Sequence, residues 1–241
     1  MRRRMFGLVC LSASAVLFCA LNVSVMAAQP AGDDFYSTYI VNRLEIGTRI
    51  IHFSLLDDKK GQPFQDSFFG SVTQLKEDQD YLPLKLFVQY KIIPQFGVGL
   101  AYDRFSFAAG DWGIEGAGSG GADGKATLSG PLVYLLGRYP NATKFTPFCE
   151  LGFALYSASF DGDASWASSN NKSVELDSTT GFYLGVGCDM QITEQFLIDL
   201  YGRYMNVSDV NGAWFLLGNQ NGDVVLTPSY IAMGLGAKFL F

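Results

Sequence analysis

The feature that most limits the fold of this chain is a two-residue alternation of large apolar side chains, which recurs along eight segments. Between residues 81 and 93, for example, Leu84, Leu86 and Val88 share one face, while Lys85 and Gln89 lie on the other. A period of two is that of a β-strand whose two faces meet different surroundings. After residue 27 no apolar run approaches the length of about 18 residues that a transmembrane helix needs. The sequence therefore predicts strands and no membrane-spanning helix.

The connections between the predicted strands alternate between long and short. The strands are expected at residues 44–56, 81–93, 96–108, 126–139, 145–160, 176–191, 196–208 and 226–241. The long, polar connections are 57–80, 109–125, 161–175 and 209–225, and the short ones are 94–95, 140–144 and 192–195. Outer-membrane barrels have short periplasmic turns and long external loops. The sequence thus predicts an all-β fold, an eight-stranded antiparallel up-and-down transmembrane β-barrel.

The face opposite the apolar one is built from glycine and charged residues. In residues 96–103, Val98 and Leu100 alternate with Gly97, Gly99 and Asp103. An eight-stranded barrel has an interior just wide enough for side chains. We therefore expect the small and charged face to line the lumen and the large apolar face to contact lipid.

Eleven charged residues are predicted to face the lumen. They are Glu45, Asp103, Glu150, Asp189 and Asp199, with Arg49, Lys85, Lys91, Arg138, Arg203 and Lys238. Buried charges without partners are costly, so five acids and six bases are expected to pair. Two interpretations remain open. We favour a plug of paired charges that closes the lumen; the alternative is a narrow, gated pore in which one pair exchanges partners.

The N-terminus has the pattern of a secretory signal peptide. Met1 is followed by three arginines, an apolar run and a small-residue stretch that ends at Ala27 or Ala28. We predict a signal peptide over 1–27, a short periplasmic segment over 28–43 and the barrel over 44–241. The signal carries three of the 17 basic residues, which leaves 14 bases against 23 acids, a formal charge of −9. Such a balance excludes a general nucleic-acid surface.

The last residues alternate aromatic and polar side chains up to a terminal phenylalanine, with Phe239 and Phe241 flanking Leu240. This ending is similar to the C-terminal signature of outer-membrane barrels. Residues 91–99 and 144–152 resemble the turn-to-strand units of the OmpA, OmpX and OmpW type of small barrel. The resemblance implies a porin-like fold in a Gram-negative cell envelope. It also implies that the barrel-assembly machinery recognises Phe239 and Phe241.

The four long connections are acidic and contain every tryptophan. With their boundary residues they hold 15 acids and 5 bases. Such loops are either simply solvated, which we favour, or bind an external ligand such as a divalent cation or a basic partner. Trp112, Trp166 and Trp214 suit a membrane interface as well as a ligand site. Trp214 and Phe215 belong to an apolar run that is expected to cover the barrel mouth, line a ligand path or lie on lipid.

The remaining reactive residues give little support for catalysis. Cys149 and Cys188 fall on the outward face of neighbouring strands, and we expect two thiols facing lipid rather than a disulfide. The single histidine, His52, shares a face with Ser54. This pair is similar to the dyad of lipid A deacylase barrels, but the rest of that motif and an orienting acid are missing. No cofactor or metal motif occurs.

We therefore predict a non-enzymatic barrel with a structural and surface-interaction role. A narrow channel for small, hydrophobic solutes is the alternative, and a lipid A-modifying enzyme is a remote one. The expected partners are outer-membrane lipid, lipopolysaccharide and the barrel-assembly machinery, and a monomer is expected.

Overall fold

A computed structural model describes residues 39–56, 74–79, 84–110, 122–164, 167 and 171–241 of the 241-residue chain. The predicted signal peptide, residues 1–27, and most of the predicted periplasmic segment lie outside these described residues. Within them, no helix is both long enough and apolar enough to cross a membrane.

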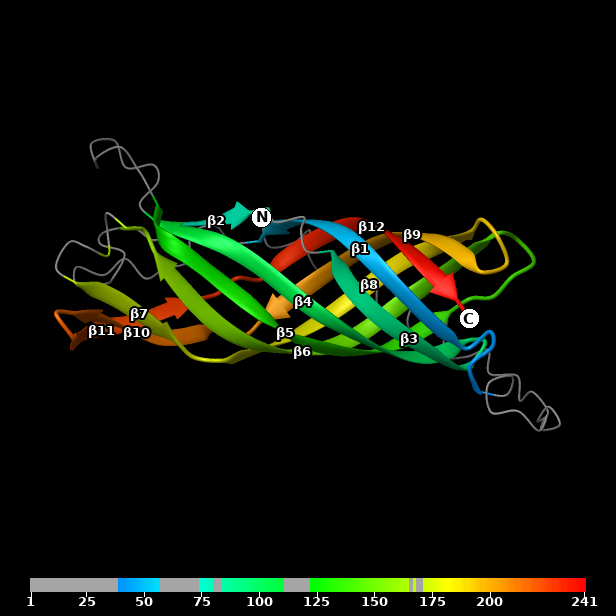
Figure 1. Cartoon of the computed structure of the whole chain (residues 1–241), viewed down its shortest axis with the longest axis horizontal. Helices are drawn as coiled ribbons and strands as arrows, with labels where there is room; N and C mark the ends of the chain where they lie inside the picture. The colour runs from blue at the N-terminus through cyan, green and yellow to red at the C-terminus, as the bar shows by residue number, and fades with distance from the viewer. Residues whose placement is uncertain (1–38, 57–73, 80–83, 111–121, 165–166, 168–170) are drawn as a thin grey trace, which may run out of the picture.

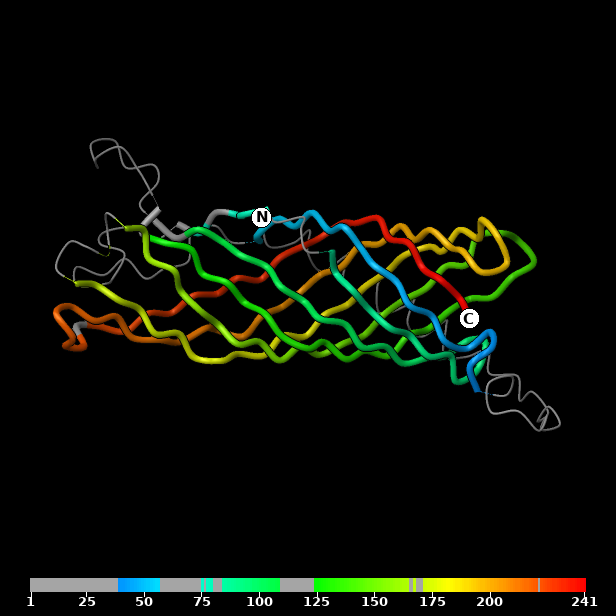
Figure 2. Tube along the Cα trace, in the orientation of Figure 1, coloured from blue at the N-terminus to red at the C-terminus, as the bar shows by residue number. Residues whose placement is uncertain are grey.

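Eight antiparallel strands form a closed barrel (Figures 1 and 2). In chain order they are β1 (Leu44–Leu55), β3 (Lys85–Ile93), β4 (Phe96–Gly110), β5 (Ala122–Arg138), β6 (Phe145–Gly162), β8 (Thr179–Gln191), β9 (Phe196–Val207) and β12 (Tyr230–Leu240). Each strand pairs with the next, and β12 closes the barrel on β1 from Glu45–Leu240 to Leu55–Tyr230. The predicted fold class is confirmed.

Four further strands lie in segments that we expected to be long polar loops. They are β2 (Gln74–Asp78), β7 (Lys172–Leu176), β10 (Val210–Leu216) and β11 (Asn219–Leu226). Strand β2 pairs with the far end of β4, and β11, β10 and β7 form a separate sheet. Figure 1 shows these strands gathered at one end, which we call the extended end. The short connections lie at the opposite, short-turn end.

Two strand starts differ from the prediction for the same reason. Strand β8 begins at residue 179 instead of 176, and β12 at 230 instead of 226. Strand β3 begins at residue 85 instead of 81, and residues 81–83 lie outside the described residues. The residues just before β8 and β12 belong to β7 and β11, which leave the barrel wall to form the separate sheet. Apolar alternation alone could not distinguish these strands from the barrel strands that follow them.

A band of exposed apolar side chains surrounds the short-turn half of the barrel. It includes Ile50, Leu86, Leu100, Tyr102, Val133, Leu135, Phe153, Leu155, Leu200, Met233 and Leu235, each 49% exposed or more. Water would not solvate such a band favourably, whereas a bilayer would. The outward positions thus have the character that we predicted for contact with lipid.

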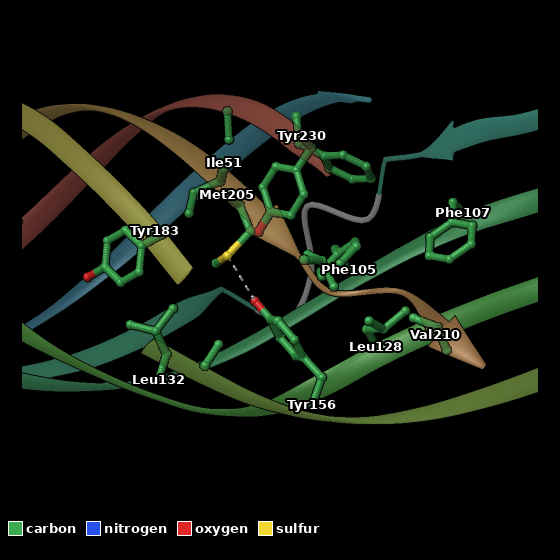
Figure 3. Close-up of a cluster of buried hydrophobic side chains, with 14 of the residues drawn as sticks. Ile51, Phe105, Phe107, Leu128, Leu132, Tyr156, Tyr183, Met205, Val210 and Tyr230 are labelled. Atoms are coloured by element: carbon green, nitrogen blue, oxygen red, sulfur yellow. Dashed lines mark hydrogen bonds between the residues drawn. The ribbon is translucent and has the colours of Figure 1, made fainter. Parts of the chain in front are cut away.

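The interior of the barrel changes character along its axis. The charged residues lie in the short-turn half and the middle of the barrel. A buried apolar cluster, part of which is drawn in Figure 3, fills the extended half and reaches between the charges as far as Leu136 and Phe148. In that cluster the Phe105 ring lies 4.8 Å from the Tyr230 ring and 5.5 Å from the Tyr156 ring, between centroids. Phe107 and Leu128 are fully buried. We had expected large apolar side chains to face outward throughout, and this expectation is wrong for the extended half.

Glycines in the inner wall make room for aromatic rings. A Cβ atom on Gly99 would come within 2.1 Å of the Tyr134 ring, and one on Gly152 within 1.9 Å of the Tyr183 ring. The glycine-rich face of the strands therefore leaves space that tyrosine side chains fill from neighbouring strands. The lumen is packed rather than open at this level.

Candidate functional site

The eleven charged residues that the sequence placed in the lumen all lie in its interior, and ion pairs join them into a set of eight and a set of three. Nine of them are buried, and the side chains of Lys85 and Lys91 are each 17% exposed. We call the eleven residues together the inner charge network. It has a part near the short-turn end and a part at the middle of the barrel.

At the short-turn end, Glu45 of β1 accepts bonds from two bases. Its Oε1 lies 2.7 Å from Arg138 Nη1 and 2.8 Å from Lys91 Nζ, and Arg138 Nη2 contacts Oε2. Arg138 also donates to Gln89 Oε1 at 2.9 Å. Planar guanidinium groups suit this bidentate binding of a carboxylate. The arrangement bridges β1, β3 and β5 across the interior.

Two aspartates from adjacent strands share a lysine. Asp189 of β8 and Asp199 of β9 are directly opposed in the sheet register. Lys238 Nζ lies 2.6 Å from Asp189 Oδ1 and 3.5 Å from Asp199 Oδ2, and its side chain is fully buried. Two opposed carboxylates repel each other, so this lysine offsets an otherwise unfavourable pair.

Arg49 connects the aspartate pair to the centre of the barrel. Its Nε lies 2.6 Å from Asp199 Oδ2 and its Nη2 lies 3.0 Å from Glu150 Oε1. The guanidinium also stacks on aromatic faces, 3.9 Å from the Tyr201 ring centroid and 4.4 Å from that of Phe87. A charged group held on both its edges and its faces is fixed in one position.

Asp103 of β4 organises the part of the network next to the apolar cluster. Its Oδ2 accepts bonds from Arg203 Nη2 at 2.8 Å, Tyr156 Oη at 2.7 Å and Tyr230 Oη at 3.1 Å. Lys85 Nζ lies 3.8 Å from Asp103 Oδ1. Tyr156 and Tyr230 place their rings in the apolar cluster and donate from their hydroxyls to this carboxylate. They therefore link the apolar cluster to the inner charge network.

Sequence reasoning missed the tyrosines and Gln89 as members of the network. Gln89 Nε2 donates to the Tyr134 hydroxyl at 2.9 Å, and Tyr183 donates to Glu150 Oε2 at 3.2 Å. Their strand positions carried the signal, because each shares the face of a predicted lumen charge. A buried tyrosine hydroxyl needs a partner, which these charges supply.

A small cavity lies beside Asp103 in the barrel interior, lined by residues of β1, β3, β4, β5, β8 and β9. Its volume is about 20 Å³, which is room for one water molecule. Arg49, Lys85 and Arg203 line it together with Asp103, and Leu86 and Tyr102 form part of its outer edge. The Nε atom of Arg203 is buried and has no hydrogen-bond partner among the described residues.

Trp214 and Phe215 lie in strand β10 rather than in a loop. Trp214 is 8% exposed and belongs to the buried apolar cluster, with Val210 of the same strand. The expectation that Trp214 lies at an interface or covers the mouth as a loop is therefore wrong. Its strand packs on the same buried cluster that fills the extended half of the barrel. Trp112 and Trp166 lie outside the described residues.

The two phenylalanines of the predicted assembly signal end the last strand. Phe239 is 42% exposed and pairs with Ile46 of β1. The Phe241 N–H donates to the Leu44 carbonyl at 3.0 Å, and the two phenylalanine rings lie 5.1 Å apart. The strand end is thus fixed to β1, with Phe239 on the outer surface.

The other reactive residues lie on the outer surface. Cys149 and Cys188 are not joined by a disulfide; Cys149 pairs with Val186, two residues from Cys188 in the register. The Ser54 hydroxyl donates to Glu77 Oε1 at 3.2 Å, whereas a nucleophilic serine gives its proton to histidine. Among the described residues, no group of three or more His, Cys, Asp or Glu could hold a metal ion.

No protein-family model matches the chain, and no curated protein matches its sequence. The crystal structure of the outer membrane protein OprG from Pseudomonas aeruginosa matches with a TM-score of 0.58 and 18% identity, over 84% of this chain and 99% of OprG. The chain has the fold of the small eight-stranded outer-membrane β-barrels. The solid-state NMR structure of outer membrane protein AlkL in lipid bilayers also matches, with a TM-score of 0.56 and 14% identity over 90% of this chain and 96% of AlkL.

Proposed function

We propose that this chain is a bacterial outer-membrane protein with a closed lumen, whose role is to anchor the folded structure at the extended end on the cell surface. The barrel stabilises the envelope, and the extended end contacts basic external molecules, or lipopolysaccharide through bridging divalent cations. The role is non-enzymatic. The observation that carries this proposal is the set of contacts inside the barrel, where buried ion pairs and packed aromatic rings cross the interior.

The closure is supported at two levels of the barrel axis. Near the short-turn end, Arg138 and Lys238 cross the interior to reach carboxylates on other strands. Farther along, the rings of Phe105, Tyr156 and Tyr230 pack edge to face or tilted in the centre (Figure 3). A solute would have to displace both layers, and breaking buried ion pairs costs several kcal/mol, on the order of 3–5.

The surface of the extended end supports a preference for basic partners. The exposed acidic residues there are Asp161, Asp163, Glu175, Asp177, Asp209 and Asp223. Two bases on the same part of the chain, Lys125 and Lys172, are half-buried. An acidic surface attracts cations and basic molecules and repels acidic ones.

Single-channel recording tests the closed lumen. Residues 28–241 would be refolded in detergent and inserted into a planar lipid bilayer, with a large porin in the same membrane as the positive control. We expect no discrete openings beyond the baseline. Regular openings of one size would contradict the plug and favour the alternative, a narrow channel for small hydrophobic solutes.

Cysteine labelling of intact cells tests the orientation. In a chain with Cys149 and Cys188 changed to Ala, Leu217→Cys would place a thiol at the β10–β11 turn, where Leu217 is 67% exposed. Asn141→Cys is the matched control at a short turn. A membrane-impermeant maleimide should label only the first variant. Labelling of Asn141→Cys alone would show that the extended end faces the periplasm.

A further inference from the structure

The turn between β10 and β11 has an unexpected residue at its centre. Leu217 and Gly218 join the two strands, and the last strand pair before them is Leu216–Asn219. Both central residues have positive φ, 52° for Leu217 and 80° for Gly218. Positive φ at both positions is the mark of a type I′ turn, which favours asparagine, aspartate or glycine. The other described non-glycine residues with positive φ are both asparagine, so Leu217 is not the residue that the turn itself would select.

Folding does not bury the Leu217 side chain either. Leu217 is 67% exposed, whereas Leu56, another exposed leucine beyond the apolar band, is 41% exposed. A Cβ atom on Gly218 would meet no described neighbour within 4 Å. Figure 1 shows β10 and β11, in orange, running to the tip of the extended end. An exposed apolar residue in a conformation that disfavours it points to a role outside the fold.

The hairpin presents an apolar tip on a firm base. Trp214 of β10 and Leu226 of β11 lie in the buried apolar cluster, and β7 pairs with the other edge of β10. Next to Leu217 at the tip, Leu216 and Phe215 are half-buried. The residues opposite them across the turn are the uncharged Asn219 and Gln220. The tip is therefore apolar, bordered by amides and fixed to a packed core.

The charges of this sheet are also ordered by distance from the tip. Lys172 of β7 is paired with Leu216, next to the turn. The acids Glu175 and Asp223 are both paired with Ala213, four residues before Leu217. An apolar point, followed by amides and one cation and then by acids, matches the order of acyl chains, lipid headgroups and water at a bilayer surface.

We infer that the tip of the β10–β11 hairpin inserts into a second lipid bilayer that faces the cell and has no net charge, such as one of phosphatidylcholine. Leu217 enters the acyl region, Lys172 lies at the level of the lipid phosphates, and the acids stay in water, where they disfavour an anionic bilayer. One leucine binds weakly, so the contact needs many barrels acting together. That this bilayer belongs to another cell rests on the proposed outward orientation of the extended end.

Docking of barrel-containing vesicles to a supported bilayer tests the inference. Residues 28–241 would be reconstituted into fluorescent phosphatidylcholine vesicles by detergent removal. Barrels then have both orientations, and each vesicle presents many extended ends whatever the orientation in cells. More vesicles should dock on a supported phosphatidylcholine bilayer than protein-free vesicles do, and fewer should dock on one that contains phosphatidylglycerol.

Leu217→Asn separates the contact with the bilayer from the stability of the turn. Asn–Gly is the favoured pair for this turn, so urea titration should find this variant at least as stable as the unmodified barrel. Docking should nevertheless fall by about ten-fold or more, because the loss at each hairpin is multiplied over many barrels. Leu56→Asn is the matched control, since it removes an exposed leucine away from the tip, and it should leave docking unchanged.

A fluorescent probe distinguishes insertion from contact at the surface. In a chain with Cys149 and Cys188 changed to Ala, an NBD group would be attached to Asn219→Cys, beside the tip. Its emission should be quenched when the acceptor bilayer contains lipids with spin-labelled acyl chains. The same lipids in the barrel's own vesicle should not quench it. Adding Leu217→Asn to this chain should abolish the quenching.

Four outcomes would overturn the inference. They are docking of Leu217→Asn equal to that of the unmodified barrel, docking without quenching by the acceptor bilayer, and stronger docking on phosphatidylglycerol, which would assign the contact to the charge of Lys172. Docking only on bilayers that contain membrane proteins would assign the tip to a protein pocket. Labelling of Leu217→Cys on intact cells tests the orientation separately, so a failure of the proposed function is distinguishable from a failure of the hairpin to insert.

Discussion

The inward positions of the two halves of the lumen are filled by residues of opposite chemistry. In the short-turn half, inward positions hold the ion pairs around Glu45, Lys238 and Arg49, and outward positions are apolar. In the extended half, inward positions hold Phe105 and Phe107, while the outward Arg104 is exposed. The second half has the arrangement of a water-soluble protein. One continuous set of strands therefore carries a membrane barrel and a soluble core in series.

The boundary between the halves is visible within single strands, where the large apolar residues move from the outward face to the inward face. In β4, Leu100 and Tyr102 are exposed at even positions, whereas Phe105 and Phe107 are buried at odd positions. In β6, the outward positions change from Phe153 and Leu155 to Ser157 and Ser159, whereas Tyr156 is buried. The same positions face inward on both sides of the boundary; what changes is which face holds the large apolar residues. The outer solvent thus decides which chemistry the interior must have.

The largest expected effect is the loss of the shared lysine in the charged half. Lys238→Met should lower the free energy of unfolding by about 3 kcal/mol. The opposed Asp189 and Asp199 would lose the cation that they share, and Asp189 would keep only Arg138, at 3.5 Å. Urea titration of the barrel in lipid vesicles would measure this change. Lys91→Met is the control and should cost about 1 kcal/mol at most, since Glu45 keeps Arg138. A Lys238→Met barrel as stable as the unmodified one would show that the network is not needed for folding.

The apolar half should respond to lost volume instead of lost charge. Leu128 is fully buried in the cluster, and Leu128→Ala should cost about 3 kcal/mol by the same titration, through lost burial and the cavity left behind. Ser159→Ala, at an exposed position of β6, should stay within about 0.5 kcal/mol. If Leu128→Ala had no larger effect than Ser159→Ala, the extended half would not be a packed core.

Much of the fold was predictable because β-strand alternation fixes which residues share a face. A shift of one residue would exchange the two faces of a strand, so Glu45, Arg138 and Lys238 could be placed inside with no knowledge of their partners. The partners themselves were not predictable. Which carboxylate Lys238 reaches depends on the stagger of β8, β9 and β12, and alternation within one strand carries no information on stagger.

The extended half was missed because its signal is the reverse of the one used for the barrel. The segment 209–225, which contains Trp214, is rich in glycine and asparagine, which is typical of a loop. The switch from Tyr102 to Phe105 as the apolar positions of one strand was present in the sequence. Dividing each strand where its large apolar residues move from one face to the other would have marked the edge of the apolar band.

Trp214 provides a smaller test, of the packing of strand β10. Trp214→Phe should lower the free energy of unfolding by about 1 kcal/mol, because it keeps most of the apolar volume. The difference between the fluorescence spectra of the two proteins gives the emission of Trp214 alone. That emission should lie at short wavelength and resist quenching by acrylamide, as for a buried indole. Emission like that of tryptophan in water would place Trp214 on the surface and contradict the packed outer sheet.

The smallest expected effect concerns the seam where β2 meets β1, beyond the apolar band. Side chains of β2 and of the residue after it bind the β1 backbone there. Gln79 Nε2 donates to the Phe53 carbonyl at 2.5 Å, and Glu77 Oε1 accepts from the Leu55 N–H at 2.8 Å. Burial alone would raise the pKa of Glu77. Backbone N–H groups, the Ser54 hydroxyl and nearby His52 outweigh this, and the net pKa lies below 4.5.

The sign of this shift sets the pH dependence of the seam. A carboxyl whose pKa is lowered on folding stabilises the protein above its unfolded pKa, and this contribution disappears as the pH falls through the folded value. Glu77→Gln should therefore cost less than about 1 kcal/mol at pH 7, and the difference from the unmodified barrel should shrink to nothing as the pH falls below 4.5. Urea titrations of both proteins between pH 7 and pH 3 would measure it. A difference that persists at pH 3 would mean that shape, and not charge, holds β2 against β1. The contact between β2 and β1 would then be stabilised by packing, as in the extended half, and not by charge, as in the short-turn half.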